Sequence, residues 1–433
     1  MRKLAILAFS FSGAVFGAAR LLPENWLPAG AVAAGFLFLA LLVFRRGLGD
    51  SGLALRLVCA GCALGLAWTA AYIQIFFQPA RELDGQTVLL CAEAADWPQE
   101  GDYGWSVLVK LKTDRGISLS TVLYLDEQGS QVKPGDRLST VAHCTLGDRT
   151  LTGEEITYYT AKGIFLRAHA YGRLDTQRPE RVPIRYWSAL LSKELKAGIS
   201  AAFPKDTAPL IQALVTGNRD GLTDQFTTSL QRTGLSHTVA VSGMHLAFLS
   251  GLLTLLLGRG KRSTAVANLV WAVLFCGIAG NTPSVLRAAV MISMLQLAPL
   301  FRRERDGATA LGLALMGLLA WNPFSAAHLG LQLSFGAVAG ILLVSDRIQN
   351  GMRRLLRLEG PRKSPVTRLL LVVPDFLVST LSATLGASLL TVPLVAVYFG
   401  YLSLIAPLAN LLTLWAVEDD VTTLLPVHIT KGR

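Results

Sequence analysis

The residues best suited to chemistry lie in one apolar stretch, residues 234–251, which contains two histidines and several hydroxyl side chains. Ser242 and His245 are three positions apart and share one face of a helix, and His237 lies about two turns before His245. Ser236 can cap this helix and leave free N–H groups at its outer end, which attracts anions such as phosphate. Polar side chains at membrane depth are costly and normally face a partner or a water-filled path. The stretch therefore predicts either a polar pathway or hydrogen bonds that hold helices together.

Two further groups place polarity in apolar stretches. Arg287 stands just inside an expected span, beside the polar turn of residues 281–284. It either snorkels outward to the headgroups or faces a partner inside the protein. Gln332 and Ser334 put an amide and a hydroxyl in the middle of another span, where they serve either a pathway or an interhelical hydrogen bond.

These side chains form no recognisable catalytic or metal site. Ser242 and His245 have no acidic residue nearby in the membrane block to orient the histidine, and the chain has no Gly-x-Ser-x-Gly elbow. The six histidines are scattered, without the spacing of a zinc site. A phosphate loop for ATP is also absent from the sequence. We therefore predict no enzyme, with no nuclease or ATPase activity, no metal and no cofactor.

The elements that must position these residues are membrane helices. The 433-residue chain is 52% hydrophobic and only 16% charged, against roughly 25% charged in soluble proteins. Its uncharged runs reach or approach the length of about 20 residues that a span needs. We expect three helices within residues 1–80 and a second block of spans within residues 236–417. The expected helices are 4–20, 27–44, 53–77, 237–257, 264–280, 284–301, 307–321, 325–344, 370–397 and 404–417.

The net charge of +11 reflects topology more than nucleic-acid binding. The basic residues cluster in short loops that fall on one side if the spans alternate, while the opposite loops carry almost none. This is the positive-inside pattern of a cytoplasmic face. We therefore predict a multi-pass protein of the bacterial inner membrane with a cytoplasmic N-terminus, and residues 81–235 on the outer side.

Residues 81–180 have a different composition. Polar and apolar residues alternate there between turn signals, which predicts several short strands in a small barrel or sandwich. Residues 183–235 follow as amphipathic helices, the first of which suits the headgroup plane. The fold class is thus a polytopic α-helical membrane protein with an inserted extracytoplasmic all-β domain.

Two cysteines, Cys91 and Cys144, fall in separate strand-like stretches of the inserted domain. Disulfides persist outside the cytoplasm, so we expect a bond between them, against the alternative of two buried free thiols. Cys59 and Cys62 lie in an apolar helix, where small side chains aid packing.

Several stretches, in this order and spacing, resemble the ComEC family of competence proteins over about residues 185–417. They are Ala213-Leu-Val-Thr-Gly-Asn-Arg-Asp-Gly-Leu-Thr-Asp, Arg232-Thr-Gly-Leu-Ser-His, Ala240-Val-Ser-Gly-Met-His, Thr282-Pro-Ser-Val-Leu-Arg-Ala-Ala289, Leu331-Gln-Leu-Ser-Phe335, Thr391-Val-Pro-Leu with Tyr398-Phe-Gly, and Pro407-Leu-Ala-Asn410.

The resemblance implies an inner-membrane channel that passes single-stranded DNA into the cytoplasm during natural transformation. It implies an OB-like barrel for the inserted domain, a fold that commonly binds single strands. The implied partners are single-stranded DNA, membrane lipid, and either further copies of the chain or other DNA-uptake proteins. The positions carried over to the DNA pathway are Arg219, Asp220, His237, Ser242, His245, Arg287, Gln332, Ser334 and Asn410.

Two departures from the family pattern stand out. The chain has no His-x-His-x-Asp-His motif of a metallo-β-lactamase-like domain, and residues 418–433, where three carboxylates interrupt an apolar run, resemble a truncated or frameshifted tail. The inserted domain carries 11 Lys/Arg against 15 Asp/Glu over residues 81–180, a net of −4, so DNA binding there needs a local patch. The candidates for that patch are Trp97, Tyr103, Trp105, Lys110 and Lys112. A small-solute or lipid transporter and a non-functional remnant stay open as alternatives.

Overall fold

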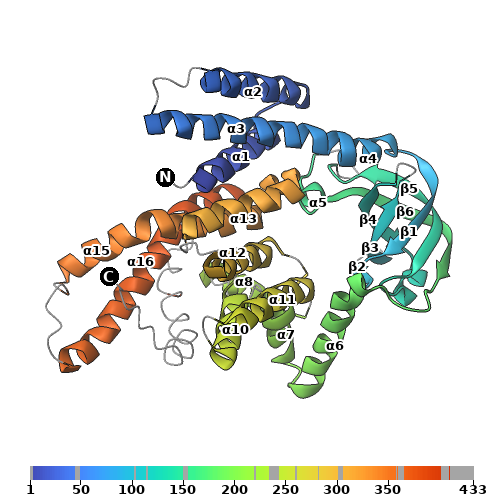
Figure 1. Ribbon diagram of the computed structural model, residues 1–433. Coiled ribbons are helices and arrows are strands. Elements are labelled where there is room, and N and C mark those ends of the chain that lie inside the picture. Colours follow the sequence, from blue (N-terminus) through green and yellow to red (C-terminus); the bar gives the residue numbers. More distant parts are fainter. Residues whose placement is uncertain are drawn as a thin grey trace. The chain divides into compact units, whose positions relative to one another are not determined.

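A computed structural model (Figure 1) describes residues 3–43, 49–101, 104–113, 116–149, 155–218, 221–233, 243–258, 261–280, 282–300, 306–356, 358, 365–400 and 409. The chain divides into two compact units. Unit 1 comprises Met1–Leu195 and Gly312–Leu331, and unit 2 comprises Lys196–Leu311 and Gln332–Arg433. Each unit is described by itself.

Three apolar helices begin unit 1: α1 (Lys3–Arg20), α2 (Leu27–Val43) and α3 (Gly49–Tyr72). The third continues through a π-helical turn, Ile73–Phe77, into α4 (Gln78–Glu82), and so runs further than the sequence predicted. Helices α1 and α3 are in close contact, because a Cβ added at Gly61 or Gly65 would lie 2.7 or 2.6 Å from a backbone oxygen of α1. Small residues four apart commonly allow such an approach in membranes.

Five helical stretches among the described residues are long and apolar enough to cross a membrane. They are Lys3–Arg20, Glu24–Val43, Gly52–Glu82, Leu329–Leu355 and Pro374–Phe399. Four shorter apolar helices accompany them, namely His245–Leu257, Arg262–Ile278, Ser284–Leu297 and Gly307–Trp321. The chain is thus a multi-pass membrane protein with a separate β-sheet region.

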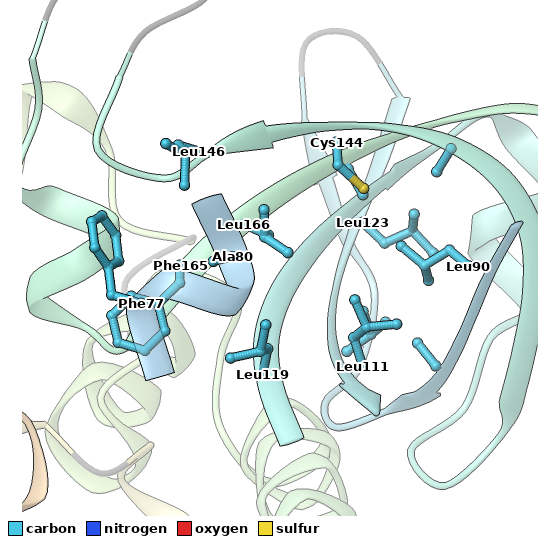
Figure 2. Close-up of a cluster of buried hydrophobic side chains, with 14 of the residues drawn as sticks. Phe77, Ala80, Leu90, Leu111, Leu119, Leu123, Cys144, Leu146, Phe165 and Leu166 are labelled. Atoms are coloured by element: carbon cyan, nitrogen blue, oxygen red, sulfur yellow. The ribbon is translucent and has the colours of Figure 1, made fainter. Parts of the chain in front are cut away.

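The β-sheet region has strands β1 (Thr87–Ala94), β2 (Gln99–Gly101), β3 (Gly104–Lys112), β4 (Ser118–Leu125), β5 (Arg137–Leu146) and β6 (Ile164–Gln177). Their order is β1-β5-β6-β4-β3-β2, and β1 also pairs with β3, so five strands form a closed circuit of pairings. Only the β4–β6 pairing is parallel among these. Alternating apolar residues point inward, as a period of two requires, and Figure 2 shows Leu90, Leu111, Leu123 and Leu166 gathered there.

Aromatic rings join the sheet to the helices of unit 1. Phe77 of the π-helical turn meets Phe165 of β6 at 5.7 Å between ring centroids, and Phe324 at 5.2 Å. Phe324 belongs to a 3-10 turn (Pro323–Ala327) that follows α13 (Gly307–Trp321). The buried amide of Asn322 donates to Thr160 O and Ala161 O, which end the short helix α5 (Tyr158–Ala161).

The predicted disulfide between Cys91 and Cys144 is wrong. Both residues are free cysteines, one exposed and the other buried. Cys91 of β1 pairs with Ser139 of β5, so Cys144 lies five residues further along that strand. At about 3.4 Å per residue this is roughly 17 Å, far beyond the Cα separation of about 4.4–6.8 Å that a disulfide needs.

The chain passes from unit 1 to unit 2 along α6 (Trp187–Ala202). Trp187 and Leu191 are exposed on its apolar face, as is Ile184 in the preceding 3-10 turn (Ile184–Tyr186). A position in the headgroup plane stays a prediction. Helices α7 (Ala208–Thr216) and α8 (Asp224–Thr233) follow. Gly217 ends α7 in a left-handed conformation with φ of 77°, which a glycine adopts without strain.

The apolar helices of unit 2 are α10 (Gly243–Leu257), α11 (Arg262–Ile278), α12 (Pro283–Leu300), α14 (Leu329–Gly340) and α16 (Pro365–Phe399). Helix α15 (Asp346–Leu355) is polar and carries Asp346, Arg347, Arg353 and Arg354. A π-helical turn, Ile341–Ser345, joins α14 to α15. The helix therefore continues to Leu355, where the sequence predicted a loop after residue 344. The tail 418–433 and the expected span 404–417, apart from Ala409, lie outside the described residues.

Candidate functional site

Three polar residues of unit 2, Ser284, Arg287 and Ser334, meet where α12 begins. Together with Thr282, which lies just before α12, we call them the arginine cluster. Ser284 and Arg287 are three residues apart on α12 and so share one face. Arg287 Nη1 donates to Ser334 O of α14 at 2.8 Å. Ser334 Oγ donates to Ser284 Oγ at 3.5 Å, at the limit of a hydrogen bond. The guanidinium of Arg287 also lies 6.0 Å from the ring centroid of Phe335.

Two polar atoms of the arginine cluster have no partner. Arg287 Nε and Thr282 Oγ1 are both buried, and neither hydrogen-bonds to any residue that the structure describes. No described carboxylate forms an ion pair with Arg287. Burying a charge without a counter-charge is costly, and an unpaired buried donor adds to that cost. The cluster therefore offers a positive charge and an unused N–H donor to an anion.

The start of α10 lies directly against the arginine cluster. A Cβ added at Gly243 would lie 2.7 Å from Ala288 Cβ and 3.4 Å from Arg287 Nη2. His245 lies two residues further along α10 and is half-buried. A glycine at position 243 thus lets the backbone of α10 approach the guanidinium.

Gln332, also expected in the pathway, lies on α14 two residues before Ser334. Its Oε1 accepts a hydrogen bond of 3.2 Å from the hydroxyl of Tyr398 on α16. Tyr398, Thr282 and Ser284 lie within the sequence motifs but were not among the predicted pathway residues. The signal for Ser284 was its three-residue spacing from Arg287, and neither Thr282 nor Tyr398 gave a comparable one.

A second polar network in the same unit has every partner it needs. Ser250 Oγ donates to Asn268 Oδ1 at 2.8 Å, and Asn268 Nδ2 donates to Thr254 Oγ1 at 2.9 Å. This network joins α10 to α11 and is what helix-to-helix hydrogen bonding looks like in an apolar block. The arginine cluster differs because Arg287 Nε and Thr282 Oγ1 have no hydrogen-bond partner among the described residues.

Five of the predicted pathway residues lie outside the described residues, namely Arg219, Asp220, His237, Ser242 and Asn410. The structure brings together Arg287 and Ser334, and it gives Gln332 a partner on α16. Within the part of the chain that the structure describes, no group of three or more His, Cys, Asp or Glu side chains could hold a metal ion.

The candidate DNA-binding residues of the β-sheet region have different surroundings. Trp97 Nε1 donates to Ala189 O of α6, and Lys193 Nζ lies 3.5 Å from the centroid of the Trp97 ring. Trp105 is half-buried and packs against the hydrophobic core. Lys110 and Lys112 are exposed on β3. Tyr103 lies outside the described residues.

Comparisons with known proteins show which family this chain is similar to. The family model described as "Competence protein" matches residues 214–425, a range that includes the arginine cluster. The ComE operon protein 3 of Bacillus subtilis (strain 168) is 31% identical over 168 residues, covering 38% of this chain and 22% of that protein. Competence protein ComA of Neisseria gonorrhoeae is 23% identical over 376 residues, covering 82% of this chain and 49% of that protein.

The chain spans less than half of the length of either relative. No solved structure matches it. The family match includes the residues around Arg287 and Ser334, and the second relative extends the similarity over most of the chain. Together the matches support a ComEC-family competence protein.

Proposed function

We propose that the chain forms part of an inner-membrane channel that passes single-stranded DNA into the cytoplasm during natural transformation. A DNA strand carries one negative charge per phosphate, and its transfer through an apolar layer needs cations and hydrogen-bond donors along the path. The names of the two relatives, a competence protein and a ComE operon protein, support a role in DNA uptake.

The proposal rests on one observation, which is that the buried Nε–H of Arg287 has no hydrogen-bond acceptor among the described residues. A guanidinium offers five N–H donors in a planar fork that matches phosphate geometry. Arg287 uses Nη1 on Ser334 O, whereas its buried Nε–H has no partner among the described residues. A phosphate that passes the cluster can therefore accept a charge-assisted hydrogen bond without first breaking an ion pair. A small-solute or lipid transporter would need no phosphate-binding cation here, unless its cargo were anionic.

We further propose that the β-sheet region is OB-like and lies on the outer side of the membrane, with the N-terminus in the cytoplasm. The five-strand circuit of pairings with one parallel pair supports an OB-like arrangement. The basic loops support the orientation. Homo-oligomers or other DNA-uptake proteins would complete the channel.

The test is the uptake of fluorescent DNA into the cytoplasm of a transformable host that carries this chain in place of its own homologue. We expect Arg287→Leu to lower uptake per inserted molecule by about 10-fold or more, because a charge-assisted hydrogen bond contributes about 1.5–3 kcal/mol. Arg287→Lys keeps the charge without the fork and should retain part of the uptake.

Asn268→Leu is the matched control. It removes a buried polar side chain that only joins helices, so it should lower the amount of inserted protein and leave uptake per molecule unchanged. Normal uptake by Arg287→Leu, at a normal protein level, would refute the proposal.

A further inference from the structure

The negative charge of the inserted domain is unevenly distributed. No Asp or Glu occurs in strands β3 and β4 or in residues 164–171 of β6. These strands are neighbours in the sheet, so they form one continuous surface without carboxylates. Lys110 and Lys112 alternate with buried residues of β3 and are exposed on the face opposite the core. The domain is thus acidic in total but has a basic face on these strands.

The register brings aromatic rings to the same face. Tyr124 of β4 and His169 of β6 are directly paired, and their rings stack at 4.6 Å with an angle of 9° between planes. Both are half-buried and point away from the core, as do Lys110 and Lys112. Tyr124 of β4 lies opposite Ser106 of β3, and Lys110 of β3 lies opposite Ser120 of β4. Tyr124 and Lys110 are therefore four residues apart along the strands, or about 14 Å.

The short helix α5 completes this face. Tyr159 OH lies 3.1 Å from Tyr124 OH, so α5 reaches β4. Next to Tyr159, Tyr158 is 58% exposed, and Lys162 Nζ lies 4.0 Å from the centroid of its ring. We call Lys110, Lys112, Tyr124, Tyr158, Lys162 and His169 the aromatic–basic face.

The carboxylate that the sheet register places beside Lys110 is already neutralised. Glu93 of β1 pairs with Lys110 across the sheet, but its carboxylate forms an ion pair with Arg185. The lysines of the face therefore do not depend on Glu93 for a counter-charge. Trp97, by contrast, is covered by α6 through Ala189 and Lys193.

We propose that the aromatic–basic face binds single-stranded DNA before it enters the membrane, an inference that rests on the function proposed above. Proteins hold single strands with exposed rings on which bases stack and with cations that follow the backbone. The face combines the exposed ring of Tyr158 on α5 and the half-buried rings of Tyr124 and His169 with the lysines of β3. In a duplex the bases are already stacked and paired, so exposed rings favour a single strand. The binding surface is then centred on Tyr124 and Tyr158 and excludes Trp97.

The test measures the anisotropy of a short fluorescent oligo(dT) that is titrated with the purified full chain in detergent. Tyr158→Ala should weaken binding by about 5-fold or more, because stacking on an aromatic ring is lost, whereas Tyr158→Phe should bind like the unchanged chain. The double variant Lys110→Ala/Lys112→Ala should reduce the slope of log affinity against log salt by about 1.4, since each cation contributes about 0.7 for single strands.

The double variant Lys133→Ala/Lys205→Ala is the matched control, because it removes two exposed lysines from elsewhere. It should bind and respond to salt like the unchanged chain. An equal change of slope in this control, unchanged binding by Tyr158→Ala, or tighter binding of a duplex than of oligo(dT) would each overturn the proposal. An equal loss with Tyr158→Phe would also count against stacking.

The two proposals fail separately in these experiments. Binding of oligo(dT) in detergent requires no transport, so it tests the face even if Arg287→Leu proves to take up DNA normally. Conversely, a chain that binds no oligo(dT) but loses uptake with Arg287→Leu would refute the aromatic–basic face and leave the channel in place.

Discussion

The contact between α10 and α12 offers a sharp test of how the arginine cluster is built. The perturbation is Gly243→Ala, which adds one methyl group where α10 approaches Arg287. The new Cβ would lie 2.7 Å from Ala288 Cβ and 3.4 Å from Arg287 Nη2. The second contact is tight but relieved by a small movement of a flexible side chain. The first is between two backbone-fixed atoms and requires the helices to separate.

Two opposing terms decide the sign of the effect. Replacing glycine by alanine in a helix interior favours the helix by about 0.5–1 kcal/mol, and this gain is smaller at the first residue of α10. Overpacking a tight contact costs about 1–3 kcal/mol. Because Ala288 is buried in a hydrophobic cluster with Leu246 and Val285, it cannot turn away. We therefore expect net destabilisation of about 1–2 kcal/mol and a displaced guanidinium.

The measurement is a double-mutant cycle with Ala288→Gly, read out by thermal unfolding in detergent and by DNA uptake. Ala288→Gly alone should cost about 1 kcal/mol through helix propensity. The double variant moves the methyl group from α12 to α10 and removes the overlap, so it should be more stable than the sum of the single effects by about 1–2 kcal/mol. Uptake should recover in the double variant. Strictly additive effects, or a Gly243→Ala chain with unchanged unfolding and uptake, would refute this account of the contact.

Three further outcomes are expected in the β-sheet region and its junction with the helices. Cys91 and Cys144 should both react with an alkylating reagent in denaturant without reductant, as mass spectrometry would show; a mass two hydrogens lower, with no alkylation, would contradict the strand register. Asn322→Leu removes three hydrogen bonds, to Thr160 O, Ala161 O and Phe324 N, and should destabilise the junction by about 2–4 kcal/mol, seen as faster proteolysis near α5. Burial, followed by the charges of Arg167 and His143, lowers the pKa of His169 from 6.5. The unfolded chain then takes up the proton first, so stability should fall as pH drops below about 6.5. His169→Gln should flatten this fall in thermal unfolding curves.

Composition and hydrophobic period were enough to predict the five apolar helices of spanning length and the strands, whereas four of the predicted spans are shorter apolar helices in the structure. Apolar runs of about 20 residues in a chain with few charges have few alternatives to spanning a membrane. In β3, Val107, Val109 and Leu111 point inward while Lys110 and Lys112 point outward, as the alternation predicted. These features are local, so a single sequence carries them.

Register and long-range contacts were not predictable in the same way. The sequence placed Cys91 and Cys144 in two strands, but only the pairing of Cys91 with Ser139 decides whether they meet. A shift in register changes which residues of two strands lie opposite each other. The alternating pattern within each strand stays the same, so that pattern alone does not fix the pairing. Trp97 likewise gave an aromatic signal, and its use in holding Ala189 of α6 depends on a contact 92 residues away.

The polar residues at membrane depth show what a structure adds to a sequence. From the sequence, both Arg287 and Gln332 were left with two interpretations. Arg287 could snorkel outward to the headgroups or face the interior, and Gln332 could serve a pathway or a bond between helices. Asn268 was not selected, yet its amide is buried and both its ends have hydroxyl partners. Arg287 is chemically the stronger donor, and its buried Nε–H has no partner among the described residues. In an apolar layer a satisfied amide stabilises packing, whereas an unsatisfied cation raises the free energy until an anion arrives. We therefore expect a phosphate at Arg287 because of its missing hydrogen-bond partner, not because of its polarity alone, and we expect the cation to matter most while DNA is passing.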